Sequence, residues 1–165
     1  MLVIIPCVSI TQVIKFPPTD STSDPTRRYL IKWKEATDSS KHSLILRNLK
    51  NGQWRKILEF GRHSDFLWAP DGNAFAIIDW VGSNCSEAWI GFPNDSSRHV
   101  NLEYHSPQVE KNDHVYYEIL SWHNSSSVLL KIKGYGEHDP KGFEKYFEAD
   151  LQGHLKEIEP RSRKK

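Results

Sequence analysis

Eight histidines are the side chains in this chain most able to hold a metal or move a proton. No two of them have the H-x-x-x-H or H-E-x-x-H spacing that puts two imidazoles on one side of a helix. No two are separated by a single residue, as two ligands on one face of a strand would be. The sequence therefore predicts no metal site, and we expect no other cofactor. The eight are His42, His63, His99, His105, His114, His123, His138 and His154.

The densest group of acid and base side chains lies in the segment GYGEHDPKG, residues 134–142. Glu137, His138 and Asp139 are consecutive there, and such groups can transfer protons or bind a cation. Three consecutive side chains rarely point at one atom, so the segment is read first as an exposed loop rich in turn-forming residues. Because loops carry binding residues more often than strands do, we keep these three residues as candidate binding residues.

Six tryptophans offer flat surfaces on which a sugar, a peptide or a base could stack. Trp80 and Trp89 lie on either side of the polar segment Ser83–Ser86 and are the better candidates for a binding surface. Packing in the core or at a sheet edge is the alternative for both. Trp68 and Trp122 occupy equivalent places in an internal repeat, which favours a core position for them.

Motifs for catalysis are missing from the sequence. It contains no G-x-S-x-G nucleophile elbow, no G-x-x-x-x-G-K and no G-x-G-x-x-G leading into a helix. Cys85 could act as a nucleophile only with a histidine beside it. We therefore name no catalytic residue and do not expect an enzyme. Cys7 and Cys85 could form one disulfide or remain two unpaired thiols.

The overall composition favours one globular domain. The chain has 165 residues, 38% of them hydrophobic and 26% charged, with a net charge of +1. Such a charge attracts neither nucleic acid nor an anionic membrane, and no apolar run is long enough to span a bilayer. Residues 1–16 are either the remnant of an export signal or an N-terminal strand, so an extracytoplasmic and a cytoplasmic location both stay open. Residues 161–165 form a basic tail.

Short runs of β-branched and aromatic residues recur along the chain, while helical periodicity is almost absent. They predict twelve strands. Asn51-Gly52 and Pro70-Asp71-Gly72 predict tight reversals between antiparallel strands, because glycine accepts a positive φ and proline fixes its own φ. Polar stretches at 17–26, 106–113 and 134–142 are expected to be loops.

The strands repeat in groups of four. WAPDGNAFAIID, residues 68–79, aligns with WHNSSSVLLKIK, residues 122–133, with tryptophan on tryptophan and turn residues on turn residues. A looser copy precedes both. The repeat predicts three blade-like units, at about 17–61, 62–104 and 114–159, in a single domain from 17 to 160.

The element FLWAPDGNAFAIID resembles the W-S-P-D-G-x-x-[IL]-A-[FY] motif of TolB-type and prolyl-oligopeptidase-type β-propellers, and more distantly WD repeats. Ala69 replaces the usual serine, and Asn124-Ser125-Ser126 replaces Pro-Asp-Gly in the second copy. The resemblance implies an all-β fold of antiparallel four-stranded blades. It implies no catalytic residue. Since a propeller closes with four or more blades, three copies predict a partial or open propeller; a β-sandwich or barrel is the alternative.

Together these features favour a non-enzymatic, β-propeller-like binding or protein-interaction module of unknown ligand. We expect a protein partner, with association between copies of the chain as another outcome. The alternative is a propeller fragment or accessory subunit of a hydrolase or peptidase, with a second chain supplying the catalytic domain.

Overall fold

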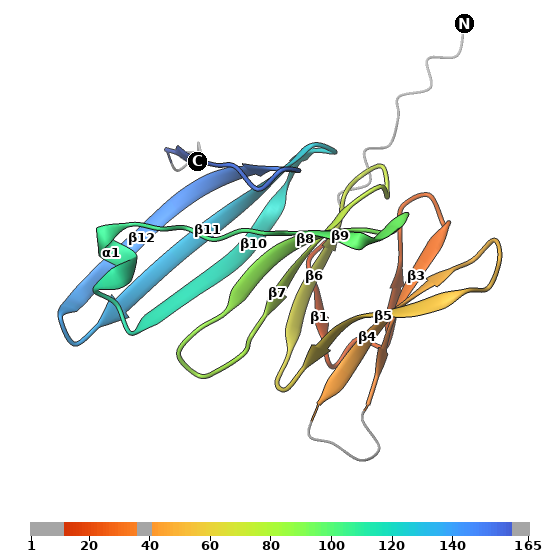
Figure 1. Cartoon of the computed structure of the whole chain (residues 1–165), viewed down its shortest axis with the longest axis horizontal. Helices are drawn as coiled ribbons and strands as arrows, with labels where there is room; N and C mark the ends of the chain where they lie inside the picture. The colour runs from red at the N-terminus through yellow and green to blue at the C-terminus, as the bar shows by residue number, and fades with distance from the viewer. Residues whose placement is uncertain (1–11, 36–40, 160–165) are drawn as a thin grey trace, which may run out of the picture.

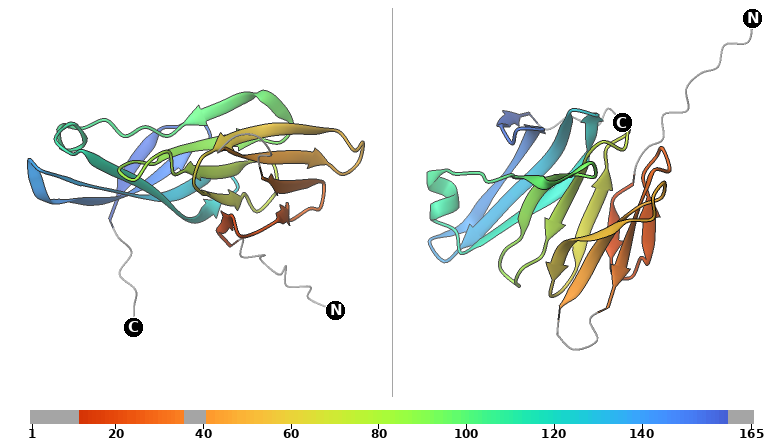
Figure 2. Two further views of the ribbon diagram at one scale, coloured as in Figure 1. Left: turned by 90° about the horizontal axis from the view of Figure 1, so that it is seen from below. Right: turned by 45° about the vertical axis from the view of Figure 1, so that its right-hand side comes forward.

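Three antiparallel sheets stand side by side in the computed structural model, which describes residues 12–35 and 41–159 (Figure 1). The predicted all-β architecture is therefore confirmed, and the sheets do not close into a ring. Each sheet contains four consecutive strands joined as a meander, and the middle sheet has one strand more. Figure 2 shows the same row of sheets from two further sides.

The first sheet of the row, sheet B, has the strand order β2-β3-β4-β5. The strands are β2 (Ser21–Ser23), β3 (Tyr29–Lys34), β4 (His42–Asn48) and β5 (Trp54–Phe60). The predicted reversal at Asn51-Gly52 joins β4 to β5, and Gly52 has a φ of 73°. The turn is longer than two residues, because the amide of Asn48 already pairs with the carbonyl of Gln53.

The middle sheet, sheet A, has the order β1-β6-β7-β8-β9. Its strands are β1 (Ile14–Phe16), β6 (Ser64–Trp68), β7 (Phe75–Asp79), β8 (Glu87–Phe92) and β9 (Asp95–Asn101). The strand β1 precedes sheet B in the sequence but pairs with β6, with Phe16 opposite Ser64. The sheet therefore holds strands from both sides of sheet B in the sequence, which ties the two sheets together.

The last sheet, sheet C, has the order β10-β11-β12-β13. Its strands are β10 (His114–Asn124), β11 (Ser127–Gly136), β12 (Asp139–Asp150) and β13 (Leu155–Ile158). The connection from β9 to β10 contains a four-residue helix, α1 (Pro107–Glu110), where the Ser106 hydroxyl accepts a hydrogen bond from the amide of Val109 at 3.2 Å.

The prediction that the three polar stretches are loops throughout was wrong. Residues 17–26 contain β2, residues 106–113 contain α1, and residues 134–142 contain the ends of β11 and β12. A strand of three residues and a helix of one turn are too short for hydrophobic periodicity to reveal. At 134–142 pairing across the hairpin continues to Gly136 and Asp139, whatever the polarity of the side chains.

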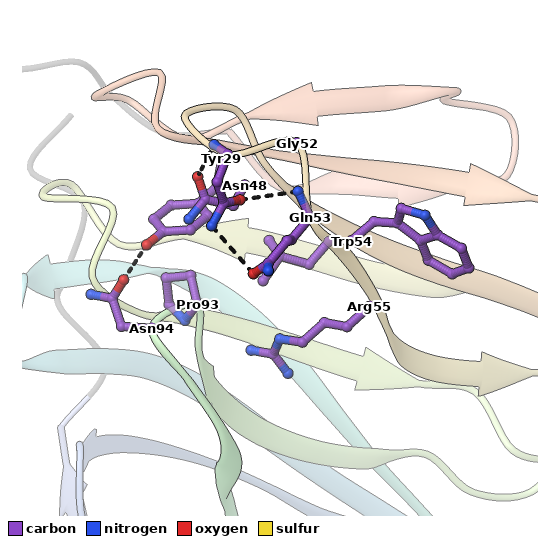
Figure 3. A pocket seen from close by; sticks show the side chains of 10 residues that line it. Tyr29, Asn48, Gly52, Gln53, Trp54, Arg55, Pro93 and Asn94 are labelled. Atoms are coloured by element: carbon purple, nitrogen blue, oxygen red, sulfur yellow. Dashed lines mark hydrogen bonds between the residues drawn. The ribbon is translucent and has the colours of Figure 1, made fainter.

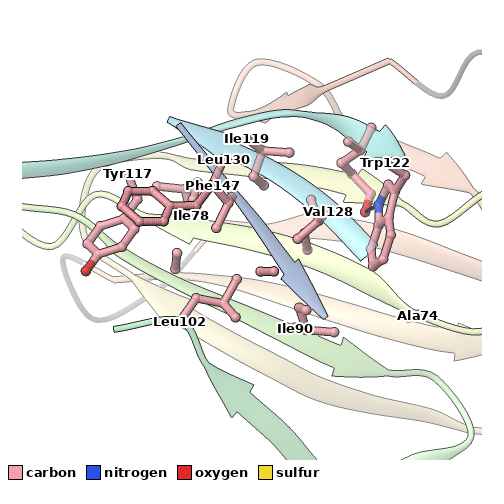
Figure 4. Close-up of a cluster of buried hydrophobic side chains, with 14 of the residues drawn as sticks. Ala74, Ile78, Ile90, Leu102, Tyr117, Ile119, Trp122, Val128, Leu130 and Phe147 are labelled. Carbon is pink, nitrogen blue, oxygen red and sulfur yellow. Dashed lines mark hydrogen bonds between the residues drawn. The ribbon is translucent and has the colours of Figure 1, made fainter. Parts of the chain in front are cut away.

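Two apolar clusters hold the row together, one on each face of sheet A. Figure 4 shows the cluster between sheets A and C, where Ile78 and Ile90 of sheet A meet Ile119 and Leu130 of sheet C. The other cluster lies between sheets A and B. Strict alternation along β6 and β7 supplies both clusters, because successive side chains point to opposite faces. Burying each large apolar side chain stabilises the fold by roughly 1.5–3 kcal/mol.

The outward faces of the two end sheets are mainly polar. On sheet C the ammonium of Lys131 pairs with the carboxylate of Glu118 at 2.6 Å, and the Ser127 hydroxyl donates to Glu148 at 2.6 Å. On sheet B the outward face carries Lys32, Lys34 and Arg47. Terminal units of stacked repeats need such polar outer faces to stay in water. The apolar clusters of the row therefore lie at its two inner interfaces, between sheets B and A and between sheets A and C.

Candidate functional site

Five aromatic rings lie next to one another across the junction of sheets A and C, and we call them the aromatic strip. Neighbouring ring centroids are 4.7–6.4 Å apart and their planes differ by 13–35°. His63 stacks on Trp80 and His114 stacks on Tyr135, so in each pair one face of each ring is covered by the other. The strip consists of His63, Trp80, Tyr116, His114 and Tyr135.

Trp80 is fixed at the sheet A end of the strip. Its indole Nε1 donates to Asp65 Oδ2 at 3.2 Å, and its ring stacks on His63 with centroids 4.9 Å apart. Burial lowers the pKa of His63, an effect that Asp65 opposes, so the imidazole is neutral at pH 7. Asp65 Oδ1 is buried and has no hydrogen-bond partner within the described part of the chain.

Tyr116 occupies the centre of the strip. Its hydroxyl donates to the carbonyl oxygen of Ser83 at 2.8 Å, which joins β10 to the segment between β7 and β8. The contact with the hydroxyl of Tyr135, together with burial, raises the pKa of Tyr116 to about 12. The phenol therefore stays protonated. The ammonium of Lys133 lies 5.8 Å from the centre of the Tyr116 ring, a cation–π contact.

The predicted loop residues lie just beyond the sheet C end of the strip. Tyr135, whose side chain is 47% exposed, pairs with His114, and the next residues form the β11–β12 turn. Glu137 and His138 are exposed, and the Glu137 amide donates to Asp113 Oδ2 at 3.3 Å. Asp139 Oδ1 accepts from the Gly142 amide at 3.1 Å, so this carboxylate supports the turn. Four of the five predicted site residues therefore lie at the two ends of one strip.

Trp89, the fifth predicted residue, lies elsewhere. It pairs with Ile77 and packs against the cluster between sheets A and B, whereas Trp80 packs against the cluster between sheets A and C. The two tryptophans flank the Ser83–Ser86 segment in the sequence but serve opposite faces of sheet A. Trp89 lines a cavity of about 310 Å³ together with Arg55 and His99.

Four members of the strip were not identified from the sequence, namely His63, Tyr116, His114 and Tyr135. His114 and Tyr116 carried one available signal, because residues i and i+2 of a strand share a face. Their meeting with Tyr135 and Trp80 depends on the β10–β11 register and on the packing of two sheets. No such contact can be read from local sequence.

Metal binding finds no support in the described ranges, 12–35 and 41–159. They contain no group of three or more His, Cys, Asp or Glu side chains able to hold a metal ion. Cys85 is half-buried beside the start of β8, while Cys7 lies outside the described residues. Within the same ranges, no helix has the length and apolarity needed to cross a membrane.

The fold and the strip define a class, an all-β protein of three blade-like sheets with a strip of aromatic rings at one junction, in which Tyr135 is exposed and Tyr116 is buried. No protein-family model matches the chain, and no curated protein matches it. A solved structure from a structural and mechanistic analysis of two prolyl endopeptidases is similar, with 10% identity and a TM-score of 0.37. The match covers 93% of this chain and 29% of that chain. A likeness at this level carries no argument about activity.

Proposed function

We propose that this protein is a non-enzymatic, propeller-like binding module that holds a protein partner on the aromatic strip. The observation that carries the proposal is the run of five neighbouring rings from His63 to Tyr135. Tyr135 is 47% exposed. Rings held in place by strands lose little conformational freedom on binding, so they make good contact surfaces.

The chemistry of the strip favours a partner segment with proline, aromatic or aliphatic side chains, which stack on flat rings. Polar groups at its margin add direction. Lys133, whose ammonium lies over the Tyr116 ring, supplies a positive charge. Glu137 and His138 in the adjoining turn are exposed and form the rim of this surface.

The proposal is tested by placing a photocrosslinking phenylalanine analogue at position 135 in cells that make the protein. The matched control carries the analogue at position 120, since Leu120 is 39% exposed and lies outside the strip. We expect a discrete crosslinked partner from position 135 only. That partner should then bind the purified Tyr135→Ala variant about tenfold or more weakly, as expected for a central aromatic contact, and bind Leu120→Ala normally.

Two results would count against this function. One is equal crosslinking from positions 135 and 120, which would mean that the strip attracts no specific partner. The other is turnover of substrate by the purified chain in a broad hydrolase panel. Light scattering with small-angle X-ray scattering shows, in the same preparation, whether the partner is a second copy of the chain.

A further inference from the structure

A large cavity lies away from the strip, between sheet B and sheet A. It has a volume of about 730 Å³ and opens between the β4–β5 hairpin and the β8–β9 turn. Figure 3 shows Tyr29, Gln53 and Arg55 from sheet B facing Pro93 and Asn94 from that turn. The Tyr29 hydroxyl donates to Asn94 Oδ1 and joins the two walls.

The lining of this cavity is rich in hydrogen-bond donors and contains no carboxylate. Arg55 is the one charged side chain among its ten lining residues, and four others are carboxamides. The oxygens of Asn94 and Gln53 already accept hydrogen bonds, from Tyr29 and from Asn51. Their NH₂ groups are therefore the groups left to bind a ligand, and such donors need an acceptor-rich ligand.

Arg55 itself has unused binding capacity. Its guanidinium is half-buried and donates one hydrogen bond, from Nη2 to the carbonyl oxygen of Phe92 at 2.8 Å. Burial lowers the pKa of Arg55, and the charge of Asp95 opposes this. The Asp95 carboxylate accepts a hydrogen bond of 2.7 Å from the Ser97 hydroxyl and makes no ion pair with Arg55. A guanidinium has five N–H donors, so a partly desolvated one in this state is suited to an oxyanion.

A second cavity, of about 310 Å³, adjoins the first at Arg55, which lines both. Trp89, His99 and Phe75 line it, with Glu87 as its one carboxylate. Glu87 begins β8 and Phe92 ends it, so Glu87 and the Arg55 contact lie roughly 15 Å apart along the strand. Lys56 and Arg98 also line the second cavity, so the combined cavity is mainly cationic, with aromatic rings and the single carboxylate of Glu87.

The strand beside both cavities is β5, which stands at the edge of sheet B. An edge strand offers backbone N–H and C=O groups to an added extended chain. A peptide matches these groups along its whole length, which a sugar or a phosphate ester does not.

We propose that this cleft binds an extended acidic peptide segment, with a glutamate or aspartate carboxylate of the segment held by Arg55 and a flat or apolar side chain lying on Trp89. The site is independent of the aromatic strip, because Trp89 lies on the opposite face of sheet A from Trp80. Either site can therefore fail without the other.

The test titrates the full chain, labelled with ¹⁵N, with three probes followed by NMR. The first is a short capped peptide containing glutamates and one tryptophan, the second is the same peptide with glutamines, and the third is glucuronic acid. We expect the glutamate peptide to shift the Arg55 Nε–H and the side-chain amides of Gln53 and Asn94 in a saturable way. The glutamine peptide should bind about tenfold or more weakly, as expected for loss of a charge-assisted contact.

Variants separate the site from general electrostatics. Arg55→Gln and Asn94→Asp should each weaken the glutamate peptide about tenfold or more, the second because it puts a negative charge into the lining while keeping an acceptor for Tyr29. Arg47→Gln, on the outward face of β4, and Asn84→Asp, between β7 and β8, are the matched controls and should bind normally. The tryptophan fluorescence of each variant under thermal unfolding confirms that it folds.

Three results would overturn the proposal. They are no saturable shift with the glutamate peptide, equal binding of the glutamine peptide, and an equal loss in Arg47→Gln and Arg55→Gln. If glucuronic acid alone binds more tightly than the peptide, the site is a carboxylate site for sugars and the peptide assignment is wrong.

Discussion

The indole Nε1 of Trp122 in sheet C donates a hydrogen bond of 3.3 Å to the carbonyl oxygen of Leu67 in sheet A. Trp122 lies in the cluster between these sheets (Figure 4), and Trp68, its counterpart in the internal repeat, lies in the cluster between sheets A and B. Each repeated tryptophan thus packs against the preceding sheet of the row. Equivalent positions in the repeat therefore perform the same structural task.

This hydrogen bond predicts that Trp122→Phe destabilises the protein. The variant keeps an aromatic ring but loses the indole hydrogen bond to the Leu67 carbonyl, which costs about 1–2 kcal/mol together with lost packing. Urea unfolding followed by circular dichroism measures the change. Trp54→Phe, at a position 69% exposed, is the control and should lie within about 0.5 kcal/mol of the parent. Equal effects from both variants would show that the contact adds nothing.

The turn between β6 and β7 predicts a strong effect of Gly72→Ala. Gly72 has a φ of 68°, and an added Cβ would lie 2.4 Å from Asp24 Oδ2. Asp24 is buried and its carboxylate accepts a hydrogen bond from the amide of Tyr29, so the Asp24 side chain cannot move aside freely. We expect a loss of about 2–4 kcal/mol in the free energy of unfolding. Gly61→Ala is the control, because nothing lies within 4 Å of its added Cβ. A loss below about 1 kcal/mol in Gly72→Ala would contradict the geometry.

Asp79 predicts a pH dependence of stability. Burial and then the charge of Glu87, its cross-strand partner, raise the pKa of Asp79 to about 6 from its ordinary value of 3.8. The folded state therefore binds the proton more tightly than the unfolded chain does. Stability from this group is complete below about pH 4 and is lost as the pH rises to about 6.

Asp79→Asn tests this dependence. It should remove the decline between about pH 4 and 6 and raise the stability at pH 7 by roughly 1–3 kcal/mol. Unfolding in urea at a series of pH values measures both effects. Glu87→Gln removes only the smaller cause of the raised pKa, since burial is the larger one. This variant should therefore reduce the decline in stability without abolishing it. A parent protein that is more stable at pH 7 than at pH 4.5, with the difference abolished by Asp79→Asn, would reverse the sign and refute the prediction.

Gly91 predicts a coupling with Phe75. The two residues are cross-strand partners, and an added Cβ on Gly91 would lie 2.3 Å from the Phe75 ring. We expect Gly91→Ala to cost about 2–3 kcal/mol through overpacking. Phe75→Leu frees part of that space, so the double variant should lose less than the sum of the single losses. Strict additivity in chemical unfolding would argue against the contact.

Local chemistry settled much of the architecture in advance. Period-two alternation in stretches such as 74–81 predicts strands, because alternate side chains need opposite faces. Pro70-Asp71-Gly72 predicts the β6–β7 reversal, and the positive φ of Gly72 confirms it. The repeated tryptophans predict a row of similar units. Each of these signals depends on residues close together in the chain.

The candidate sites depended on contacts between distant segments. The sequence selected Trp80 and Trp89 together, but the two residues lie on opposite faces of sheet A. The β7–β8 connection interrupts the alternation of side chains, and the path of this connection decides which face each tryptophan occupies. Arg55 gave no local signal, since its setting comes from the β8–β9 turn of another sheet. The aromatic strip likewise requires the β10–β11 register and the packing of sheet A against sheet C.

By itself, the sequence determined an all-β chain of three repeated units, because hydrogen bonding and side-chain alternation within a strand or hairpin are local properties. Only the tertiary structure decided that β1 joins the middle sheet, that Trp80 belongs to an aromatic strip and that Arg55 donates to the Phe92 carbonyl of another sheet in a cleft. The physical reason is that strand register and sheet packing are fixed by burial of apolar area between segments far apart in the chain.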